Sequence, residues 1–359
     1  MAIDTINLTE NKFENYLRQF STTNWILCVG AGICKGILPD WFDLTLNLVN
    51  QTFNKTWDKK EFKKISDEVG FSLDSWIQGC YNKLNSEGKS VEDFNKILEN
   101  ALYYDLLVEA KKNDIKEALI DFFESPKKIK KKHLLKLYDF FETNYSWTSL
   151  IQIVKAFVYK ENKAKLPSSI ITFNADSLLH SLIILYSIKK QFDDTGNFTN
   201  PKEPFRKVSR TFQTWGDSIP IFHLHGSLSP SNSKKAVNDS RDSLIFLESS
   251  YSNVASNMYS WAQTNFLYSA QNYKMVFLGL SMSDPNIRRW LSWTNQAYIE
   301  ELSAETNGKA QSLPHLWIRT KASNDDVQDF MDLSLRHMGV KIGLIENWGK
   351  IEETLKKIM

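Results

Sequence analysis

The sequence predicts an α/β fold, in which a doubly wound, Rossmann-like parallel sheet carries a large all-helical insertion between its first and second strands. The first supporting observation is an apolar run over 24–30 that ends in a glycine-rich turn. Residues 41–160 then carry almost no strand signal, and their apolar residues recur at helical spacing. From Ser168 onward, strand-like and helix-like segments alternate, which is typical of a parallel sheet with helices on both faces.

This pattern divides the chain into two parts. Residues 1–40 together with 161–359 are expected to form the Rossmann-like domain, and 41–160 the helical insertion. Before the first strand, 1–23 are expected to form a short helix, with Phe13, Tyr16 and Leu17 at helical spacing.

The hydrophobic pattern predicts each element in turn. In the insertion, helices are expected near 41–54, 60–68, 72–84, 113–124 and 133–160. After it, strands are expected at 169–173, 219–224, 243–247, 274–280, 314–319 and 340–345. Helices are expected at 177–188, 251–270 and 285–303, with a last one from Trp348, and 189–218 is expected to be a polar loop.

Composition excludes several classes of protein. The chain has 359 residues, a formal net charge of +2 and 42% hydrophobic residues, which is ordinary for a globular protein and gives no global field for nucleic acid. The only cysteines are Cys28, Cys34 and Cys80, too few for a disulfide framework and a four-thiolate zinc site. No signal-peptide core or membrane-spanning apolar run is present, so a cytoplasmic protein is expected.

The first strand is followed directly by Gly30-Ala31-Gly32. Glycine allows the main chain to approach an anion closely, and such a turn is how a parallel strand presents backbone N–H groups to a pyrophosphate. A bare Gly-x-Gly turn is equally compatible with a strand-to-helix corner that binds nothing.

Polar residues follow three later strands, at Asn174 and Asp176, at His223 and His225, and from Ser281 to Asn286. Ligands of open α/β sheets bind beyond the carboxyl ends of the strands, so these residues are candidates for a site. Taken singly, Asn174 and Asp176 could be helix caps, and so could Ser283 or Asp284. One of the two histidines could be a hydrogen-bonded core residue. Under strict strand alternation His223 and His225 share a face, so the pattern alone does not choose between them.

Taken in order, these segments resemble the motif set of the sirtuin-like family. The resemblance spans roughly 24–345, and the last motif and the ordering resemble a bacterial branch found in anti-phage defence effectors. The motifs that carry it are Gly30-Ala-Gly32, Pro39-x-Trp41, Thr172-Phe-Asn174-Ala-Asp176, His225-Gly226 and Gly279-Leu-Ser281-x-Ser-Asp284-Pro-Asn-Ile287.

The resemblance implies that NAD is the substrate. Asn174 and Asp176 would contact the nicotinamide ribose and position a water, and His225 would be the catalytic histidine, a choice that rests on the adjoining Gly226. The dinucleotide itself would be held by Gly30, Ala31, Gly32, Cys34, Gly279 and Ser281. Cys34 stands where the family usually has a serine.

A second departure concerns the activity. Protein-deacylating sirtuins carry a four-cysteine zinc ribbon after the His-Gly motif, but no cysteine follows Cys80 here, so no metal is expected. Without that module, water is the most available acceptor, and we expect an NAD hydrolase that releases nicotinamide and ADP-ribose. The alternatives are a non-catalytic module that senses NAD or ADP-ribose and an NAD-dependent protein deacylase.

The resemblance further implies an effector that depletes NAD during phage infection and is held inactive until triggered. A homo-oligomer is expected, or a separate activator such as a hexameric DNA-translocating ATPase or an Argonaute-type protein. The dense basic run 127–132 is more typical of a solvated helix face than of a nucleic-acid contact.

Overall fold

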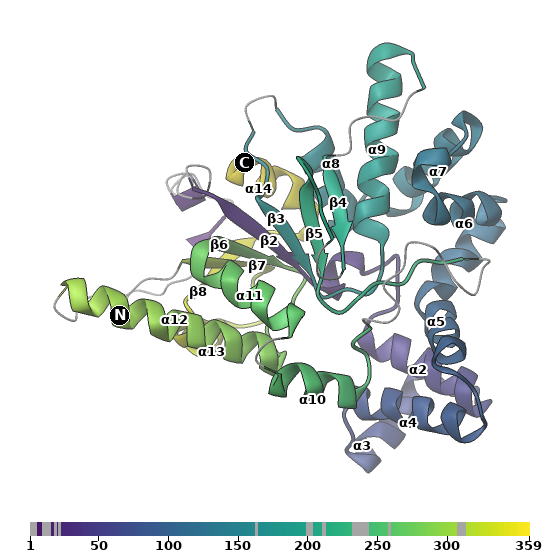
Figure 1. Cartoon of the computed structure of the whole chain (residues 1–359), viewed down its shortest axis with the longest axis horizontal. Coiled ribbons are helices and arrows are strands. Elements are labelled where there is room, and N and C mark those ends of the chain that lie inside the picture. The colour runs from purple at the N-terminus through teal and green to yellow at the C-terminus, as the bar shows by residue number, and fades with distance from the viewer. Residues whose placement is uncertain are drawn as a thin grey trace.

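The computed structural model contains a single parallel sheet with helices on both faces (Figure 1). The residues that it describes are 6–8, 16–17, 20, 23–161, 164–198, 204–209, 213–231, 244–257, 260–306 and 314–359. Eight strands lie in the order β1-β8-β7-β6-β2-β3-β5-β4. They are β1 (Ile6–Asn7), β2 (Trp25–Val29), β3 (Ser169–Thr172), β4 (Phe205–Val208), β5 (Ile219–His223), β6 (Lys274–Leu278), β7 (His315–Thr320) and β8 (Val340–Ile345).

Strand β2 is at the centre of the sheet, and all five of its residues are buried. Its Cys28 pairs with Ile171 of β3 on one side and with Phe277 of β6 on the other. The strand is a continuous apolar run because both faces of the sheet are covered. From β2 the chain builds outward to β3, β5 and β4, and then returns to the other side as β6, β7 and β8. This reversal confirms the doubly wound fold.

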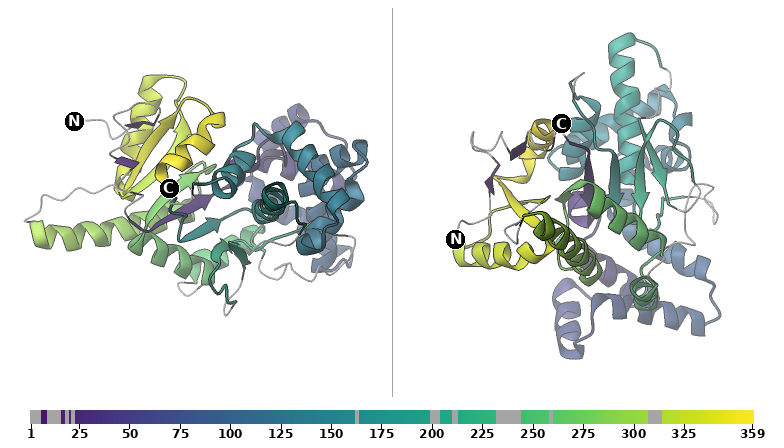
Figure 2. Two further views of the ribbon diagram at one scale, coloured as in Figure 1. Left: turned by 90° about the horizontal axis from the view of Figure 1, so that it is seen from above. Right: turned by 60° about the vertical axis from the view of Figure 1, so that its left-hand side comes forward.

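The helices divide between two hydrophobic cores, one on each face of the sheet. One core packs the helical insertion, α9 (Leu178–Thr195) and α14 (Ile351–Ile358) against β2 and β3. The other packs α11 (Trp261–Asn272), α12 (Pro285–Thr306) and α13 (Asp325–Leu335) against the opposite face. Figure 2 shows both layers with the sheet between them. Among the described helices, none is both long and apolar enough to span a membrane.

The helical insertion is confirmed between β2 and β3, which are the second and third strands because the short β1 precedes them. Most of it gathers at one end of the sheet in Figure 1, and its last helix packs against α14. Its α-helices are α2 (Trp41–Phe53), α3 (Lys59–Val69), α4 (Leu73–Ser86), α5 (Val91–Lys112), α6 (Lys116–Glu124), α7 (Lys131–Tyr145) and α8 (Ser149–Val158). The helix expected over 133–160 is two helices, because Thr148 caps a new one by accepting a bond from the Ile151 amide.

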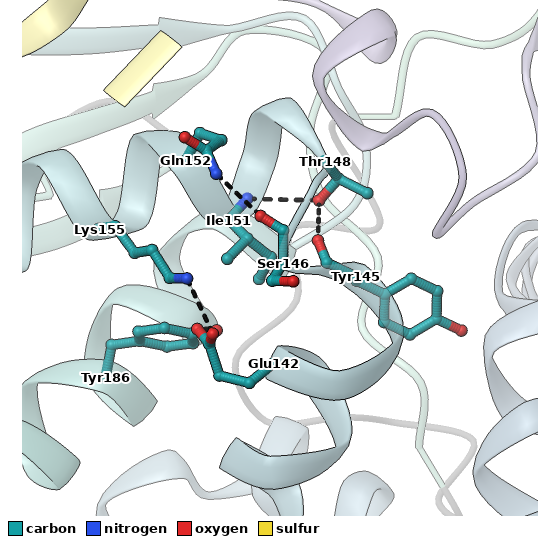
Figure 3. Close-up of polar contacts among 8 residues, drawn as sticks. All are labelled: Glu142, Tyr145, Ser146, Thr148, Ile151, Gln152, Lys155 and Tyr186. Atoms are coloured by element: carbon teal, nitrogen blue, oxygen red, sulfur yellow. Dashed lines mark hydrogen bonds and ion pairs between the residues drawn. The ribbon is translucent and has the colours of Figure 1, made fainter. Parts of the chain in front are cut away.

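A polar contact ties the insertion to the first helix after β3 (Figure 3). The Glu142 carboxylate on α7 accepts a hydrogen bond of 2.7 Å from the Tyr186 hydroxyl on α9. It also accepts one of 2.8 Å from Lys155 on α8. Three helices therefore meet at one half-buried carboxylate.

Several expected elements are wrong. Of the strand expected at 243–247, residue 243 lies outside the described residues, and 244–247 form no strand. This segment runs beside the site instead, where the Ile245 amide bonds to the His225 carbonyl. The expected loop 189–218 contains the edge strand β4, in which Phe205 and Val208 are buried. The expected helix 251–270 is divided into α10 (Glu248–Ser256) and α11. Before β2, Tyr16 and Leu17 are helical but 6–7 are β1, and Phe13 lies outside the described residues.

We expect Glu142→Ala to lower the free energy of unfolding by about 2 kcal/mol, because it leaves the buried Tyr186 hydroxyl without its acceptor. Urea unfolding of the variant and the wild type measures this difference. The matched control is Lys112→Ala, which breaks an exposed ion pair with Glu109 on α5 and should leave the midpoint unchanged. Equal effects of the two substitutions would contradict the role given to Glu142.

Candidate functional site

The carboxyl ends of four strands meet at the point where the strand order reverses. Val29, at the end of β2, pairs with Thr172 of β3 and with Leu278 of β6. Thr172 in turn pairs with His223, the last residue of β5. The segments that follow these strands therefore start at one level, and the expected convergence of the four polar strand ends is confirmed. Such a reversal is where open α/β sheets bind their ligands.

The glycine turn after β2 packs directly against the segment after β6. The Gly30 amide donates to the Leu278 carbonyl at 3.1 Å, and the Gly32 amide donates to the Gly279 carbonyl at 2.9 Å. A Cβ on Gly32 would lie 2.8 Å from the Gly279 carbonyl oxygen. Position 32 therefore requires glycine, because the main chain after β6 lies too close for a side chain. The two amides are engaged within the protein, and a ligand would meet the exposed surface of Ala31 and Gly32.

The turn continues as a short 3₁₀ helix, Ala31–Cys34, which brings the Cys34 thiol into the site. The first α-helix after it, α2, starts only at Trp41, and the Asp40 carboxylate caps it by accepting from the Asp43 amide. A carboxylate therefore already occupies the end of this helix that would attract an anion.

Cys34, Asn174 and Asp176 form one buried cluster. The Cys34 thiol lies 3.5 Å from an Asp176 carboxylate oxygen and 3.6 Å from the Asn174 amide nitrogen. Burial raises the pKa of Asp176, and burial together with the adjacent Asp176 raises the pKa of the Cys34 thiol. The Asn174 side-chain oxygen is buried and has no hydrogen-bond partner. A buried acceptor of this kind is costly unless a water or a ligand satisfies it.

Asp176 and Asp284 also accept hydrogen bonds from backbone amides at the starts of helices. Asp176 accepts a hydrogen bond of 2.9 Å from the Leu178 amide at the start of α9. Asp284 accepts one of 2.7 Å from the Asn286 amide at the start of α12. The helix-capping alternative is therefore correct for Asp284, whereas the N-cap residue of α9 is Ser177 and Asp176 bonds to the first helical amide from the position before it. The second carboxylate oxygen of Asp176 is directed to Cys34.

The two histidines separate because β5 ends at His223 and the chain then turns, with Gly226 at a φ of +75°. His223 lies 3.4 Å from the Asn174 carbonyl oxygen, and burial is the main cause that lowers its pKa to about 3. The His225 ring instead contacts the rings of Phe173 and Tyr251, at centroid distances of 5.1 and 5.4 Å. Burial lowers the pKa of His225 to about 4, against an opposing effect of Asp284, so its imidazole is neutral at pH 7.

The predicted site residues are thus brought together to different degrees. Cys34, Asn174 and Asp176 touch, and His225 contacts the ring of Phe173, the residue next to Asn174. Ser281 is exposed and shares a hydrogen bond of 2.6 Å with Ser283, on the segment that packs against the glycine turn. No further contact joins Ser281 to the cluster among the interactions of the described residues.

Two residues that contact the site could not be predicted from the sequence. Tyr251 packs on His225 from α10, and the Tyr103 hydroxyl bonds to the Ser177 amide from α5. Both stand in amphipathic helices, where an aromatic residue is more often part of the core. No local signal distinguishes them, because their role depends on which loops the helices pack against.

Comparison with known proteins identifies a domain within the chain. Residues 168–337 match the family model described as the SIR2-like domain, and no curated protein matches the sequence. The matched region contains Asn174, Asp176, His225, Gly279 and Ser281. The chain therefore carries a SIR2-like domain, and the resemblance to the sirtuin-like family is confirmed. SIR2-like domains use NAD, so the function of this chain is related to NAD.

Substitution of Gly279 by alanine should destabilise the protein more than substitution of Gly70. Both glycines adopt a positive φ, +68° and +70°, which costs an alanine roughly 1–2 kcal/mol. Only at Gly279 would the added Cβ also lie 2.5 Å from a backbone atom, the Ile33 nitrogen, whereas Gly70 has open space. Urea unfolding compares the two variants. Equal losses would show that the close approach of the two segments contributes nothing.

The buried histidines should make the protein less stable in mild acid. Burial lowers the pKa of His223 to about 3 and of His225 to about 4, below the ordinary value of 6.5. Between pH 6.5 and pH 4 the unfolded chain therefore binds more protons, and the free energy of unfolding falls as the pH falls. Burial also lowers the pKa of His315 to about 4, whereas the raised pKa values of Asp176 and Asp74 act in the opposite direction, so two carboxyl groups oppose three histidines. Urea midpoints at about pH 7.5 and pH 5 measure the difference, and equal midpoints would contradict it.

Proposed function

We propose that this chain is an NAD hydrolase that cleaves NAD to nicotinamide and ADP-ribose. The observation that carries the proposal is the unpartnered Asn174 oxygen, buried beyond the carboxyl ends of the central strands beside Asp176. Open α/β sheets bind their ligands at this position, and the match to the SIR2-like domain supports NAD as the ligand.

The residues fit a dinucleotide whose ribose is the reacting group. A ribose hydroxyl or a water can donate to the Asn174 oxygen, which has no partner within the protein. The exposed surface of Ala31 and Gly32 offers backbone without a bulky side chain at the same edge of the sheet. Both features match the chemistry of a polar, anionic ligand that must approach the main chain.

Cleavage of the nicotinamide–ribose bond develops positive charge on the sugar, while the leaving group is already cationic and needs no strong acid. The protein must therefore orient a nucleophile and accept a proton. Asn174 would orient the attacking water through its free oxygen. His225, neutral because of its burial, would accept a proton from that water or from a ribose hydroxyl. Asp176 would stabilise the developing charge when ionised.

The site is closed as it stands, since Asn174, Asp176 and His225 are each less than a tenth exposed. Tyr251 of α10 covers His225, and α10 is itself held by the insertion, where Ser75 of α4 donates 2.9 Å to Glu248. Entry of NAD requires these covering residues to move. This supports a hydrolase that is inactive until an oligomer forms or a separate activator binds, as in a cytoplasmic effector that depletes NAD during phage infection.

The alternatives have less support. A deacylase of the zinc-ribbon type would need cysteines after the His-Gly motif, and the sequence has none beyond Cys80. A module that only senses NAD or ADP-ribose remains the principal alternative, because a closed site is also compatible with binding without turnover. Release of nicotinamide without any acylated peptide distinguishes hydrolysis from both.

Asn174→Ala and His225→Ala should each reduce the rate of nicotinamide release at least a hundredfold, in line with the loss of an oriented nucleophile or a general base. The assay follows nicotinamide and ADP-ribose by chromatography, with the candidate activator present if the chain alone is silent. His337→Ala is the matched control, because this histidine is exposed and lies outside the site. Full activity in either site variant would overturn the assignment, and bound NAD without products would favour the sensing alternative.

A further inference from the structure

A buried hydroxyl group on helix α5 of the insertion forms hydrogen bonds to both loops of the site, the loop after β3 and the loop after β5. The Tyr103 side chain is fully buried, and its hydroxyl donates a hydrogen bond of 2.7 Å to the Leu228 carbonyl. The same oxygen accepts one of 3.1 Å from the Ser177 amide. Ser177 directly follows Asp176, and Leu228 is two residues after Gly226. A single oxygen atom therefore joins the loop of Asn174 and Asp176 to the loop of His225.

The loops also touch each other. Leu228 pairs with Asp176 in an isolated parallel bridge, and the Ser229 hydroxyl lies 2.7 Å from that of Ser177. The ladder between β3 and β5 has already ended at Thr172 and His223. Beyond that point, the spacing of the loops depends on these few bonds, with Tyr103 bonded to both sides.

Two further side chains on the same face of α5 form hydrogen bonds to the loop after β5. Glu99 accepts a hydrogen bond of 3.1 Å from the Ser231 amide, and Lys96 donates one of 2.7 Å to the Ser231 carbonyl. Lys96, Glu99 and Tyr103 are three and four residues apart, so they lie on one side of the helix. This face meets the loop after the His-Gly motif with a buried carboxylate, an ammonium group and a phenol.

We propose that Tyr103 is a positioning residue for the hydrolysis of NAD, an inference that rests on the proposed function. Its hydroxyl fixes the separation between the loop that orients the water and the loop that carries the base. The ring of Tyr103 fills the core of the insertion, whereas its hydroxyl is the part of the side chain that bonds to both loops. The insertion thereby helps to position the loops that carry the proposed catalytic residues.

Tyr103→Phe tests this, because it removes the hydroxyl and keeps the ring. The Ser177 amide and the Leu228 carbonyl lose their shared partner, and the loops gain freedom to separate. Since a displacement of about 1 Å can cost about a hundredfold in rate, kcat for nicotinamide release should fall roughly ten- to a hundredfold. The KM for NAD should change less than about threefold, because the exposed glycine turn at Ala31 and Gly32 is untouched.

Tyr186→Phe is the matched control. Tyr186 is also fully buried and its hydroxyl also makes a short hydrogen bond, but to Glu142 on α7 and not to the site loops (Figure 3). Both variants should lower the unfolding midpoint, whereas only Tyr103→Phe should lower kcat. Equal kcat values in the two variants would overturn the proposal. Should Tyr103→Phe fail to fold, Glu99→Gln weakens the same face from the neighbouring turn and must lower kcat in the same direction.

Amide hydrogen exchange separates this inference from the proposed function. In Tyr103→Phe, amide exchange should speed up in 174–178 and in 226–231 but not where α7 packs on α9. In Tyr186→Phe, exchange should speed up where α7 packs on α9 but not in the two loops. If the wild-type chain releases no nicotinamide under any condition, the proposed function and the catalytic role of Tyr103 both fail. Faster exchange in the two loops would then establish only that the hydroxyl joins them, and unchanged exchange would refute that as well.

Discussion

The site depends on the close approach of two main chains at the centre of the sheet. The turn of Gly30 and Gly32 lies against Gly279, with hydrogen bonds between the backbones and no room for a Cβ on either side. This contact closes the gap between the ends of β2 and β6, which are adjacent in the sheet although about 250 residues separate them in the chain. It also directs the short 3₁₀ helix so that Cys34 enters the cluster of Asn174 and Asp176.

Burial then determines the chemistry that these groups can perform. The Asn174 oxygen is kept from water without a partner, and the His225 imidazole is kept neutral by the cost of burying its charged form. Both conditions suit an enzyme whose leaving group is already cationic, because such an enzyme needs an acceptor and a base and no strong acid. The same burial destabilises the folded protein in acid, so the protonation state of the site and the stability of the fold are linked.

The helical insertion contributes to the site and is more than an appended module. Helix α5 holds both site loops through Tyr103, and α4 holds α10, whose Tyr251 covers His225. A partner or a second copy that displaced these helices would change the spacing of the loops and the access to the histidine together. This offers one physical route by which binding at the insertion could control a site at the edge of the sheet.

The sequence by itself determined six of the eight strands, the all-helical insertion and the polar residues that follow the strands, because these depend on hydrophobic periodicity and on turn residues that act over a few positions. It failed where the decisive contacts are long-range. Residues 244–247 have an apolar composition but bond to the turn at His225, and β4 exists only as an edge beside β5. The different surroundings of His223 and His225 likewise follow from the turn at Gly226, which ends the alternation of the strand. Only the tertiary structure could show that Tyr103 joins two loops, since a tyrosine on a helix takes its role from what the helix packs against.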